Sequence, residues 1–323
     1  MIQKLLQLLL HRFIEYLTLA DLQHLDTLIH RTLYAKVLKT SGTQSHYVDR
    51  KYWELLANEW HRMPLPVRPS SDDIAFYERG LGEFAANRDS VRLLILGATP
   101  ELRNMAARNK KIKVYIADLS FQHIIRNAFL GDDIDTEREI WIKENWLHLP
   151  IPDHFFDIIV GDLVLQQVRP EEEEMFMQET KRLLKKDGIC FLRLHYLDIK
   201  CTEGSIESAV EEIIQFSAPK REKLHALKMR VLWMAANLPE RHIDRRKAYE
   251  SICKYIDAKG KWAELLMNKE NMEYYKTSHR NWSPPDLNGL TELLQKHFRQ
   301  LDLHISSDYI DAKYYPLYIL TPK

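Results

Sequence analysis

The chain has 323 residues, enough to bury a hydrophobic core without disulfide bonds. Lys and Arg together number 46, as do Asp and Glu, so no net charge would draw the protein to a nucleic acid or to an anionic membrane. Gly accounts for only 10 residues, which favours a helix-rich protein. Because the acidic and basic residues balance, any charged partner must be recognised by a local group of residues.

The three cysteines, Cys190, Cys201 and Cys253, form neither a CxxC pair nor a cluster with histidines. This usage argues against a disulfide framework and against a zinc site, and it is typical of a reducing cytoplasm. The N-terminal apolar run ends after six residues, before His11, and lacks a following cleavage site. We therefore predict a cytoplasmic protein that binds no metal, no membrane and no nucleic acid.

Helical periodicity dominates the first part of the chain, over residues 5–39 and 47–62. The Pro-rich segment 63–73 ends this pattern, and a further helix is predicted to run to about Asn87. These segments together predict an N-terminal helical cap formed by residues 1–88.

From residue 91 short apolar strands alternate with helices, which indicates a parallel sheet with crossover helices. The strand candidates are 91–96, 113–117, 156–161, 188–194, 301–306 and 314–321. Between residues 202 and 278 the pattern is helical and shows no strands. We predict a core formed by residues 89–200 and 283–323, split by a helical insertion, residues 201–282, that is long enough to be a lid or a substrate subdomain.

A tight turn at Gly97 follows the first strand, and Asp118 ends the second strand. Such a turn, placed before a helix, lets backbone amides and the helix N-terminus meet a nucleotide-like ligand. The carboxylate that follows about 20 residues later is placed to accept hydrogen bonds from two ribose hydroxyls. By itself this pair fits several nucleotide-binding proteins, including NAD-dependent oxidoreductases.

Two later segments are more specific: NWLHLPIPDHFFDIIVGDLVLQQV (145–168) and RLLKKDGICFLRLHY (182–196). Together with the first two strands they resemble the class I S-adenosylmethionine-dependent methyltransferase family. In that family the first segment holds the adenine-contacting loop and the fourth strand, and the second holds a helix, a turn and the fifth strand. The resemblance implies a three-layer α/β, Rossmann-like core whose mostly parallel seven-stranded sheet has an antiparallel last strand.

The resemblance also implies S-adenosylmethionine as the cofactor, with S-adenosylhomocysteine as its product. The implied cofactor contacts are Gly97, Ala98 and Thr99 around the methionine portion, Asp118 at the ribose, Leu119, Asn145 and Trp146 at the adenine, and Asp162 near the amino group and the transferable methyl. His195 follows the fifth strand and is a candidate base or substrate contact, although a packed histidine would look the same. Thr99 and Glu101 stand where glycines are usual in the family.

The implied reaction is methyl transfer to an oxygen or nitrogen of a small-molecule acceptor, in which the protein mainly aligns nucleophile and methyl. Residues 219–247 carry nine Lys or Arg against three acidic residues, which fits a solvated helix face or a positive lid for an anionic substrate. Two alternatives are a catalytically silent binding or scaffold protein and an NAD-dependent oxidoreductase. The latter has no place for the segment 145–157, and no feature of the sequence predicts an oligomeric state.

Overall fold

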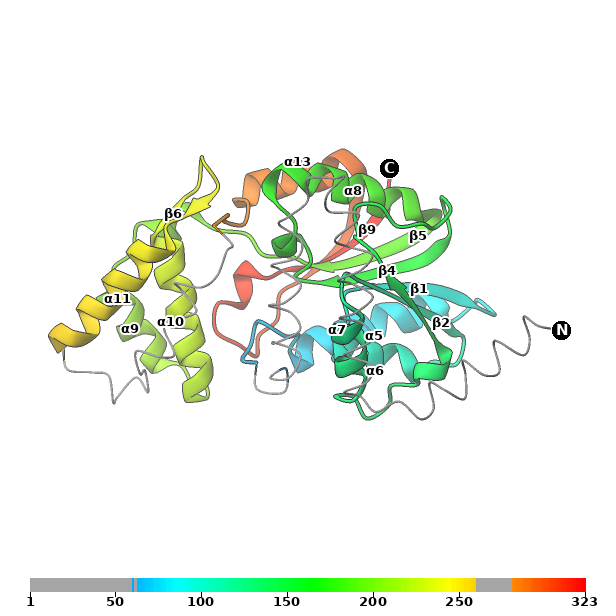
Figure 1. Cartoon of the computed structure of the whole chain (residues 1–323), viewed down its shortest axis with the longest axis horizontal. Helices are drawn as coiled ribbons and strands as arrows, with labels where there is room; N and C mark the ends of the chain where they lie inside the picture. The colour runs from blue at the N-terminus through cyan, green and yellow to red at the C-terminus, as the bar shows by residue number, and fades with distance from the viewer. Residues whose placement is uncertain (1–59, 61–62, 260–280) are drawn as a thin grey trace, which may run out of the picture.

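The computed structural model describes residue 60 and residues 63–259 and 281–323. Within them a seven-stranded sheet lies between two layers of helices (Figure 1), which confirms the predicted three-layer α/β fold class. The strands of this sheet are β1 (Val91–Leu96), β2 (Ile112–Asp118), β3 (Glu139–Lys143), β4 (Phe156–Asp162), β5 (Leu184–Arg193), β8 (Phe298–His304) and β9 (Leu317–Pro322). The helices predicted within residues 5–39 and 47–62 lie outside the described residues, apart from Trp60.

The strand order is β3-β2-β1-β4-β5-β9-β8, and β9 runs antiparallel to both of its neighbours. Strands β1 to β5 pair in parallel. The dinucleotide-binding order 3-2-1-4-5-6 lacks such a reversed strand between its fifth and sixth strands. The topology is therefore that of the methyltransferase fold, and the carboxyl ends of β1, β2, β4 and β5 meet at one edge of the sheet.

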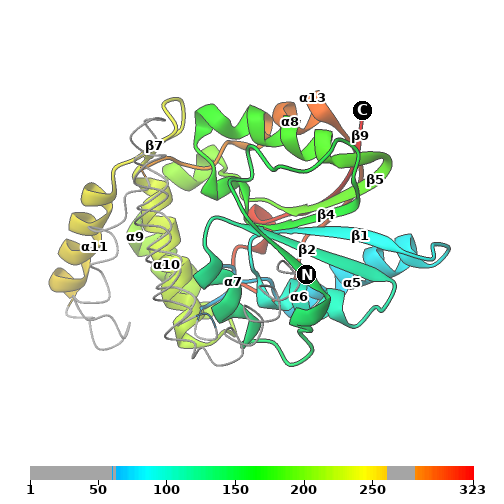
Figure 2. The same cartoon turned by 45° about the vertical axis from the view of Figure 1, so that its right-hand side comes forward.

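Strand β1 shows how the sequence builds two hydrophobic layers. Leu93 and Ile95 lie in one buried cluster with residues of α5 (Ser71–Ala85), α6 (Pro100–Ala107) and α7 (Phe121–Ala128). Leu94 and Leu96 lie in a second cluster with residues of α8 (Glu173–Leu183) and α13 (Leu287–His297). The period-2 alternation of a strand thus serves both faces, and Figure 2 shows the two helix layers on either side of the sheet. Helix α5 packs on the sheet, although the sequence analysis places it in the cap.

Strand β3 is missing from the strands predicted by the sequence. Its residues, EIWIK, are half-buried or exposed, and it pairs only with β2 at the edge of the sheet. The other strands differ from the prediction mainly at their ends: β8 begins at Phe298, earlier than residue 301, and β9 begins at Leu317 because residues 312–314 form a 3-10 turn. The 3-10 turns are η3 (Thr136–Arg138), η4 (Leu165–Gln167), η5 (Pro170–Glu172), η6 (Ile199–Thr202) and η8 (Ala312–Tyr314).

The predicted insertion, residues 201–282, is described except for residues 260–280. It contains α9 (Ile206–Gln215), α10 (Lys220–Met234) and α11 (Arg245–Lys259), whose apolar faces form a hydrophobic cluster of their own. A short hairpin of β6 (Ala236–Asn237) and β7 (His242–Ile243) corrects the prediction that the insertion has no strands. Strands of two residues are too short to leave an alternating pattern in a sequence.

Among the described residues, the contacts that attach the insertion to the core include two ion pairs and an aromatic contact. Arg230 of α10 donates to the carboxylate of Asp311 at 2.7 and 2.9 Å, and Arg241 donates to Glu173 at 2.7 and 2.9 Å. The ring of Trp233 lies 5.1 Å from that of Tyr314, edge to face. These contacts hold the helices of the insertion against the end of the sheet where the strand carboxyl ends meet. Among the described residues, no helix is long and apolar enough to cross a membrane.

Candidate functional site

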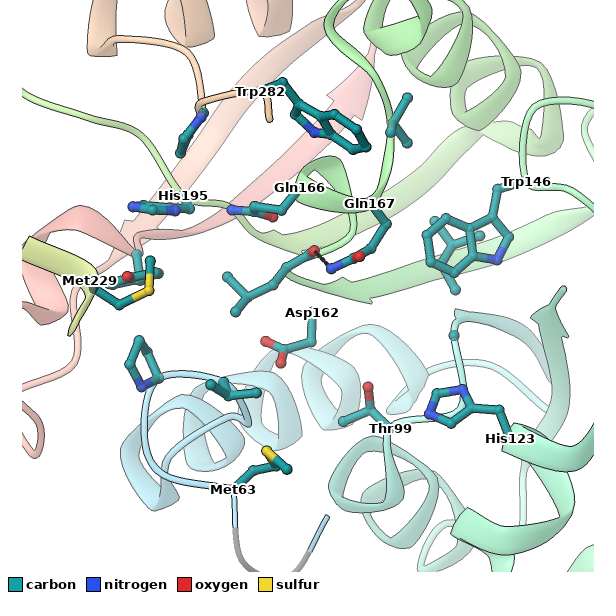
Figure 3. A pocket seen from close by; sticks show the side chains of 18 of the residues that line it. Met63, Thr99, His123, Trp146, Asp162, Gln166, Gln167, His195, Met229 and Trp282 are labelled. Carbon is teal, nitrogen blue, oxygen red and sulfur yellow. Dashed lines mark hydrogen bonds between the residues drawn. The ribbon is translucent and has the colours of Figure 1, made fainter. Parts of the chain in front are cut away.

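A cavity of about 500 Å³ lies at the carboxyl ends of β1, β2, β4 and β5, between the core and the insertion. Its walls come from the Pro-rich segment 63–67, from the loops that follow these strands, and from α10 and the start of α11. All the residues that the sequence analysis assigned to a site line it: Gly97, Ala98, Thr99, Asp118, Leu119, Asn145, Trp146, Asp162 and His195. In Figure 3, Trp146, His123 and Thr99 form one end of the cavity, and His195, Gln166, Met229 and Trp282 form the other.

The turn after β1 depends on Gly97. This residue has a φ of +88°, a conformation that side chains with a Cβ rarely adopt, and its amide donates to the carbonyl of Ala117 at 2.8 Å. Pro100 then begins α6 at the position where a fixed φ favours a helix start. The turn thus forms with one glycine, because Pro100 supplies part of the required geometry.

Glu101 stands where the family has a glycine, and its side chain is bound by residues that precede the core. Its carboxylate accepts hydrogen bonds from Nε1 of Trp60 at 3.1 and 3.2 Å and lies 3.6 Å from Nη1 of Arg68. Burial raises the pKa of Glu101, and the hydrogen bond from Trp60 works against that rise. The bulk of Glu101 is therefore accommodated by partners from the segment that precedes the core.

Asp118 ends β2, and its buried carboxylate has two neighbours that fix its orientation. Oδ1 accepts a hydrogen bond from the amide of Ser120 at 2.8 Å, and Oδ2 lies 2.7 Å from Nδ1 of His123. Nε2 of His123 in turn lies 2.9 Å from Nδ2 of Asn127. His123 and Asn127 are not among the site residues predicted from the sequence. Their spacing of four residues, on a helix that begins just after Asp118, is the signal that could have found them.

Trp146 and Asn145 lie at the predicted adenine end of the cavity. The indole Nε1 of Trp146 donates to the carbonyl of Ala117 at 2.7 Å, and its ring would lie 3.6 Å from a Cβ atom placed on Gly97. Oδ1 of Asn145 accepts from the amide of Leu147 at 3.1 Å, so it closes a turn within its own loop. An amide oxygen has two lone pairs, and one of them remains for a ligand.

Asp162 ends β4 and is paired with a buried cation. Arg193, at the end of β5, donates to the two carboxylate oxygens of Asp162 at 2.5 and 2.9 Å, and neither side chain is more than 2% exposed. Burial raises the pKa of Asp162 to about 6 in spite of the opposing charge of Arg193. The next residue, Leu163, has a φ of +52° and also lines the cavity, so the chain turns sharply where β4 reaches the site.

His195 is buried in an aromatic group at the other end of the cavity. Its ring stacks on Tyr315 at 4.4 Å between centroids and lies 5.6 Å from the ring of Trp233. Burial, and then the charge of Arg193, lower the pKa of His195 to about 3. The imidazole is therefore neutral at pH 7 and a weak proton acceptor.

The insertion supplies cationic as well as apolar groups to this end of the cavity. Lys228 and Met229 of α10, Arg245 at the start of α11, and Trp282 all line it. Burial lowers the pKa of Lys228, because the charged ammonium group loses solvation there. Among the described residues, no group of three His, Cys, Asp or Glu side chains could hold a metal ion.

Residues 97–192 match a family model described as Methyltransferase domain, and no curated protein sequence matches the chain. A putative Zn-dependent alcohol dehydrogenase from Rhodobacter sphaeroides has a similar structure, with a TM-score of 0.55 and 15% identity over 85% of this chain and 99% of that one. A TehB-like SAM-dependent methyltransferase from Corynebacterium glutamicum has a TM-score of 0.44 and 11% identity over 84% of this chain and 99% of that one. A 1,6-didemethyltoxoflavin-N1-methyltransferase from Burkholderia thailandensis was solved with bound 1,6-didemethyltoxoflavin and S-adenosylhomocysteine. It has a TM-score of 0.43 and 13% identity over 90% of this chain and 89% of that one. At these identities the structural likeness concerns the fold alone.

Proposed function

We propose that this chain, whose core belongs to the class I methyltransferase family, transfers the methyl group of S-adenosylmethionine to a small-molecule acceptor. The observation that carries the proposal is the cavity itself, which brings the Gly97 turn, Asp118 and the loop after β4 together at one edge of a methyltransferase sheet. In open α/β sheets, ligands bind at the carboxyl ends of the strands where the strand order reverses. Here that point lies between β1 and β4.

The residues present fit the cofactor. Each carboxylate oxygen of Asp118 keeps a lone pair beyond the bonds it already makes, which is what two ribose hydroxyls need. The positive φ of Gly97 lets the backbone approach a ligand closely. In this proposal Gly97, Ala98 and Thr99 hold the methionine portion, and Leu119, Asn145 and Trp146 hold the adenine.

The cofactor supplies an activated methyl group, so the protein mainly needs to align the acceptor. The acceptor would lie at the end of the cavity near His195, which α10 and Trp282 cover. Because His195 is a weak proton acceptor, we propose an acceptor whose nucleophilic atom already has an available lone pair at neutral pH. An uncharged nitrogen and an ionised oxygen both satisfy this condition.

We also propose that the acceptor carries a planar or apolar body and an anionic group. Trp233, Trp282 and Tyr315 offer aromatic surface to the body, and Lys228 and Arg245 offer positive charge to the anion. The test is to measure S-adenosylhomocysteine formation with a panel of small aromatic acids and their neutral amides. Lys228→Met should raise the KM of an acid but not that of the matching amide, and an equal effect on both would contradict an anionic acceptor.

The cofactor assignment is tested by calorimetry with S-adenosylhomocysteine. Asp118→Ala removes two charge-assisted hydrogen bonds worth about 1.5–3 kcal/mol each, so the affinity should fall at least tenfold. Asp187→Ala is the control, because Asp187 is 77% exposed and lies near the opposite end of β5 from the cavity. Binding of NADH without S-adenosylhomocysteine would support an oxidoreductase, and binding of neither would support a scaffold protein.

A further inference from the structure

The hydrogen bonds around Asp118 form a buried chain that connects the two loops of the cofactor site. The chain runs from Asp118 through His123 to Asn127, whose Nδ2 also donates to the carbonyl of Ala98 at 3.1 Å. Asp118 is 7% exposed, His123 is 5% exposed and Asn127 is fully buried. The loop after β2 is thereby attached to the loop after β1 by side chains of α7.

The direction of each hydrogen bond follows from the carbonyl of Ala98. A carbonyl only accepts, so the amide group that faces it must be the Nδ2 donor of Asn127. The same NH2 group faces Nε2 of His123, so Nε2 has to accept. The proton of the neutral imidazole is therefore on Nδ1 and points at Oδ2 of Asp118. His123 thus donates to an ionised carboxylate, which is the stronger kind of hydrogen bond.

This arrangement determines which lone pairs of Asp118 remain for a ligand. Oδ1 is occupied once by the amide of Ser120 and Oδ2 once by His123. With one bond on each oxygen the plane of the carboxylate cannot rotate, and one lone pair per oxygen is left. Two vicinal hydroxyls are the complementary ligand, because each donates one hydrogen to one oxygen.

At the other end of this chain of hydrogen bonds, Asn127 contacts the loop that lacks the usual glycines. Ala98 and Thr99 follow Gly97 in this loop, and both are buried. Asn127 holds the carbonyl of Ala98 from the side, so the loop is kept in place by a side chain of α7. Ligand contacts to this loop and to Asp118 therefore depend on the same buried network.

We propose that His123 is a positioning residue for the ribose diol of the cofactor, and that Asn127 extends its effect to the Gly97 loop. The inference rests on the proposed function and deepens it. His123 orients Asp118 and does not itself contact the hydroxyls. Its loss should reduce recognition of the diol more than binding of the rest of the ligand.

The experiment compares two probes by calorimetry: S-adenosylhomocysteine and its analogue without the ribose 2′- and 3′-hydroxyls. His123→Phe keeps a ring of similar size and removes the hydrogen bonds to Asp118 and Asn127, so affinity for S-adenosylhomocysteine should fall about tenfold or more. Affinity for the analogue should change less than about threefold. His123→Asn can place an amide N–H near the position of Nδ1, so it should recover part of the preference for the diol. His242→Phe alters an exposed histidine of the insertion that does not line the cavity, and it should leave both affinities as they are.

The outcomes separate the inference from the proposed function. An equal loss of affinity for both probes would show a merely structural role for His123, and no loss for either would also overturn the inference. Wild-type protein that binds neither probe would overturn the proposed function and the inference with it. If His123→Phe does not fold, the nitrogen resonances of His123 in the wild type provide the test. They should show the tautomer protonated at Nδ1. Protonation at Nε2 would contradict the hydrogen bonds assigned from Asp118 through His123 to Asn127.

Discussion

Arg193 is the cation on which the buried polar groups beneath the site depend. Its guanidinium has no exposed surface and donates to both carboxylate oxygens of Asp162. It also donates to the carbonyl of Pro66 at 2.8 Å and to the hydroxyl of Tyr309 at 3.2 Å, and it lies 3.4 Å from Asp73. One side chain therefore joins β4, β5, α5, the Pro-rich segment that borders the cavity, and the loop between β8 and η8.

We predict that Arg193→Met strongly destabilises the protein. Methionine fills similar space but has no donor, so Asp162 would remain buried without its cation. Breaking a buried ion pair in this way costs about 3–5 kcal/mol, a large share of the roughly 5–15 kcal/mol that stabilises a typical domain. The loss of Arg193 should destabilise the buried carboxylate of Asp73 less than that of Asp162. The amide of Ser70 at 3.0 Å and the hydroxyl of Ser306 at 2.6 Å still donate hydrogen bonds to Asp73.

Urea unfolding at pH 7, followed by tryptophan fluorescence, measures this cost. The matched control is the double variant Arg193→Met with Asp162→Asn, which removes both charges. The carboxyl of the single variant is either ionised without a partner or has to bind a proton, and the amide of Asn avoids both costs. The double variant should therefore be more stable than the single one by about 0.5–3 kcal/mol. A single variant that loses less than about 1 kcal/mol, or a double variant that is less stable than the single one, would refute the reasoning.

The same variant should show a defined pH dependence. Burial raises the folded-state pKa of Asp162 from 3.8 to about 6, so the folded protein binds this proton more tightly than the unfolded chain does. The stability that the protonated carboxyl contributes is therefore fully present below pH 3.8 and is lost as the pH rises through about 6. Without Arg193 the carboxyl should keep its proton to a higher pH. The cost of Arg193→Met should therefore be smaller at pH 5 than at pH 8, and a cost that is larger at pH 5 would contradict the assignment.

Three further predictions concern the turn, the insertion and the thiols. Gly97→Ala should lower the free energy of unfolding in urea by about 1–3 kcal/mol and weaken S-adenosylhomocysteine binding, because the φ of Gly97 is +88°. The control Gly82→Ala, in α5 with no atom within 4 Å of its Cβ position, should stabilise the protein by about 0.5–1 kcal/mol. Arg230→Met removes the pair with Asp311 and should speed proteolytic cleavage within residues 201–282 while leaving the core intact. Cys190 is fully buried, which raises the pKa of its thiol, so it should react with a thiol reagent only when the protein unfolds.

The central strands were predictable from the sequence because their apolar runs are continuous. β1 was predicted at 91–96 and lies there, since a strand covered on both faces reads as an uninterrupted apolar segment. β3 was not predicted, because an edge strand that is half-buried mixes Glu139 and Lys143 with its apolar residues. Periodicity identifies an element only where burial is strong enough to select the side chains.

The candidate site was predictable in position but not in its contacts. The turn at Gly97 and the acid at Asp118 follow consecutive strands, so their common edge of the sheet could be inferred. The predicted cofactor contact of Asp162 stays a prediction, whereas its carboxylate pairs with Arg193, a partner that the sequence did not indicate. The pairing depends on the register of β4 and β5, in which these two residues lie opposite one another. A strand register is set by the whole sheet, and the sequence of either strand does not contain it.

Two polar residues in otherwise apolar segments nevertheless signalled that partners exist. Arg193 ends a strand whose last residues read CFLR, and His123 lies on the buried face of a short helix next to Ile124. A polar group in such a place costs free energy unless it is hydrogen-bonded, so each of these residues requires a buried partner. The sequence offers several acids for each. In the folded protein Arg193 pairs with Asp162 and His123 pairs with Asp118, because these groups lie within ion-pair distance of one another. Both pairs lie where strands of the parallel sheet end side by side. The groups that support the site are therefore encoded as buried polar residues, while their pairing is a property of the sheet.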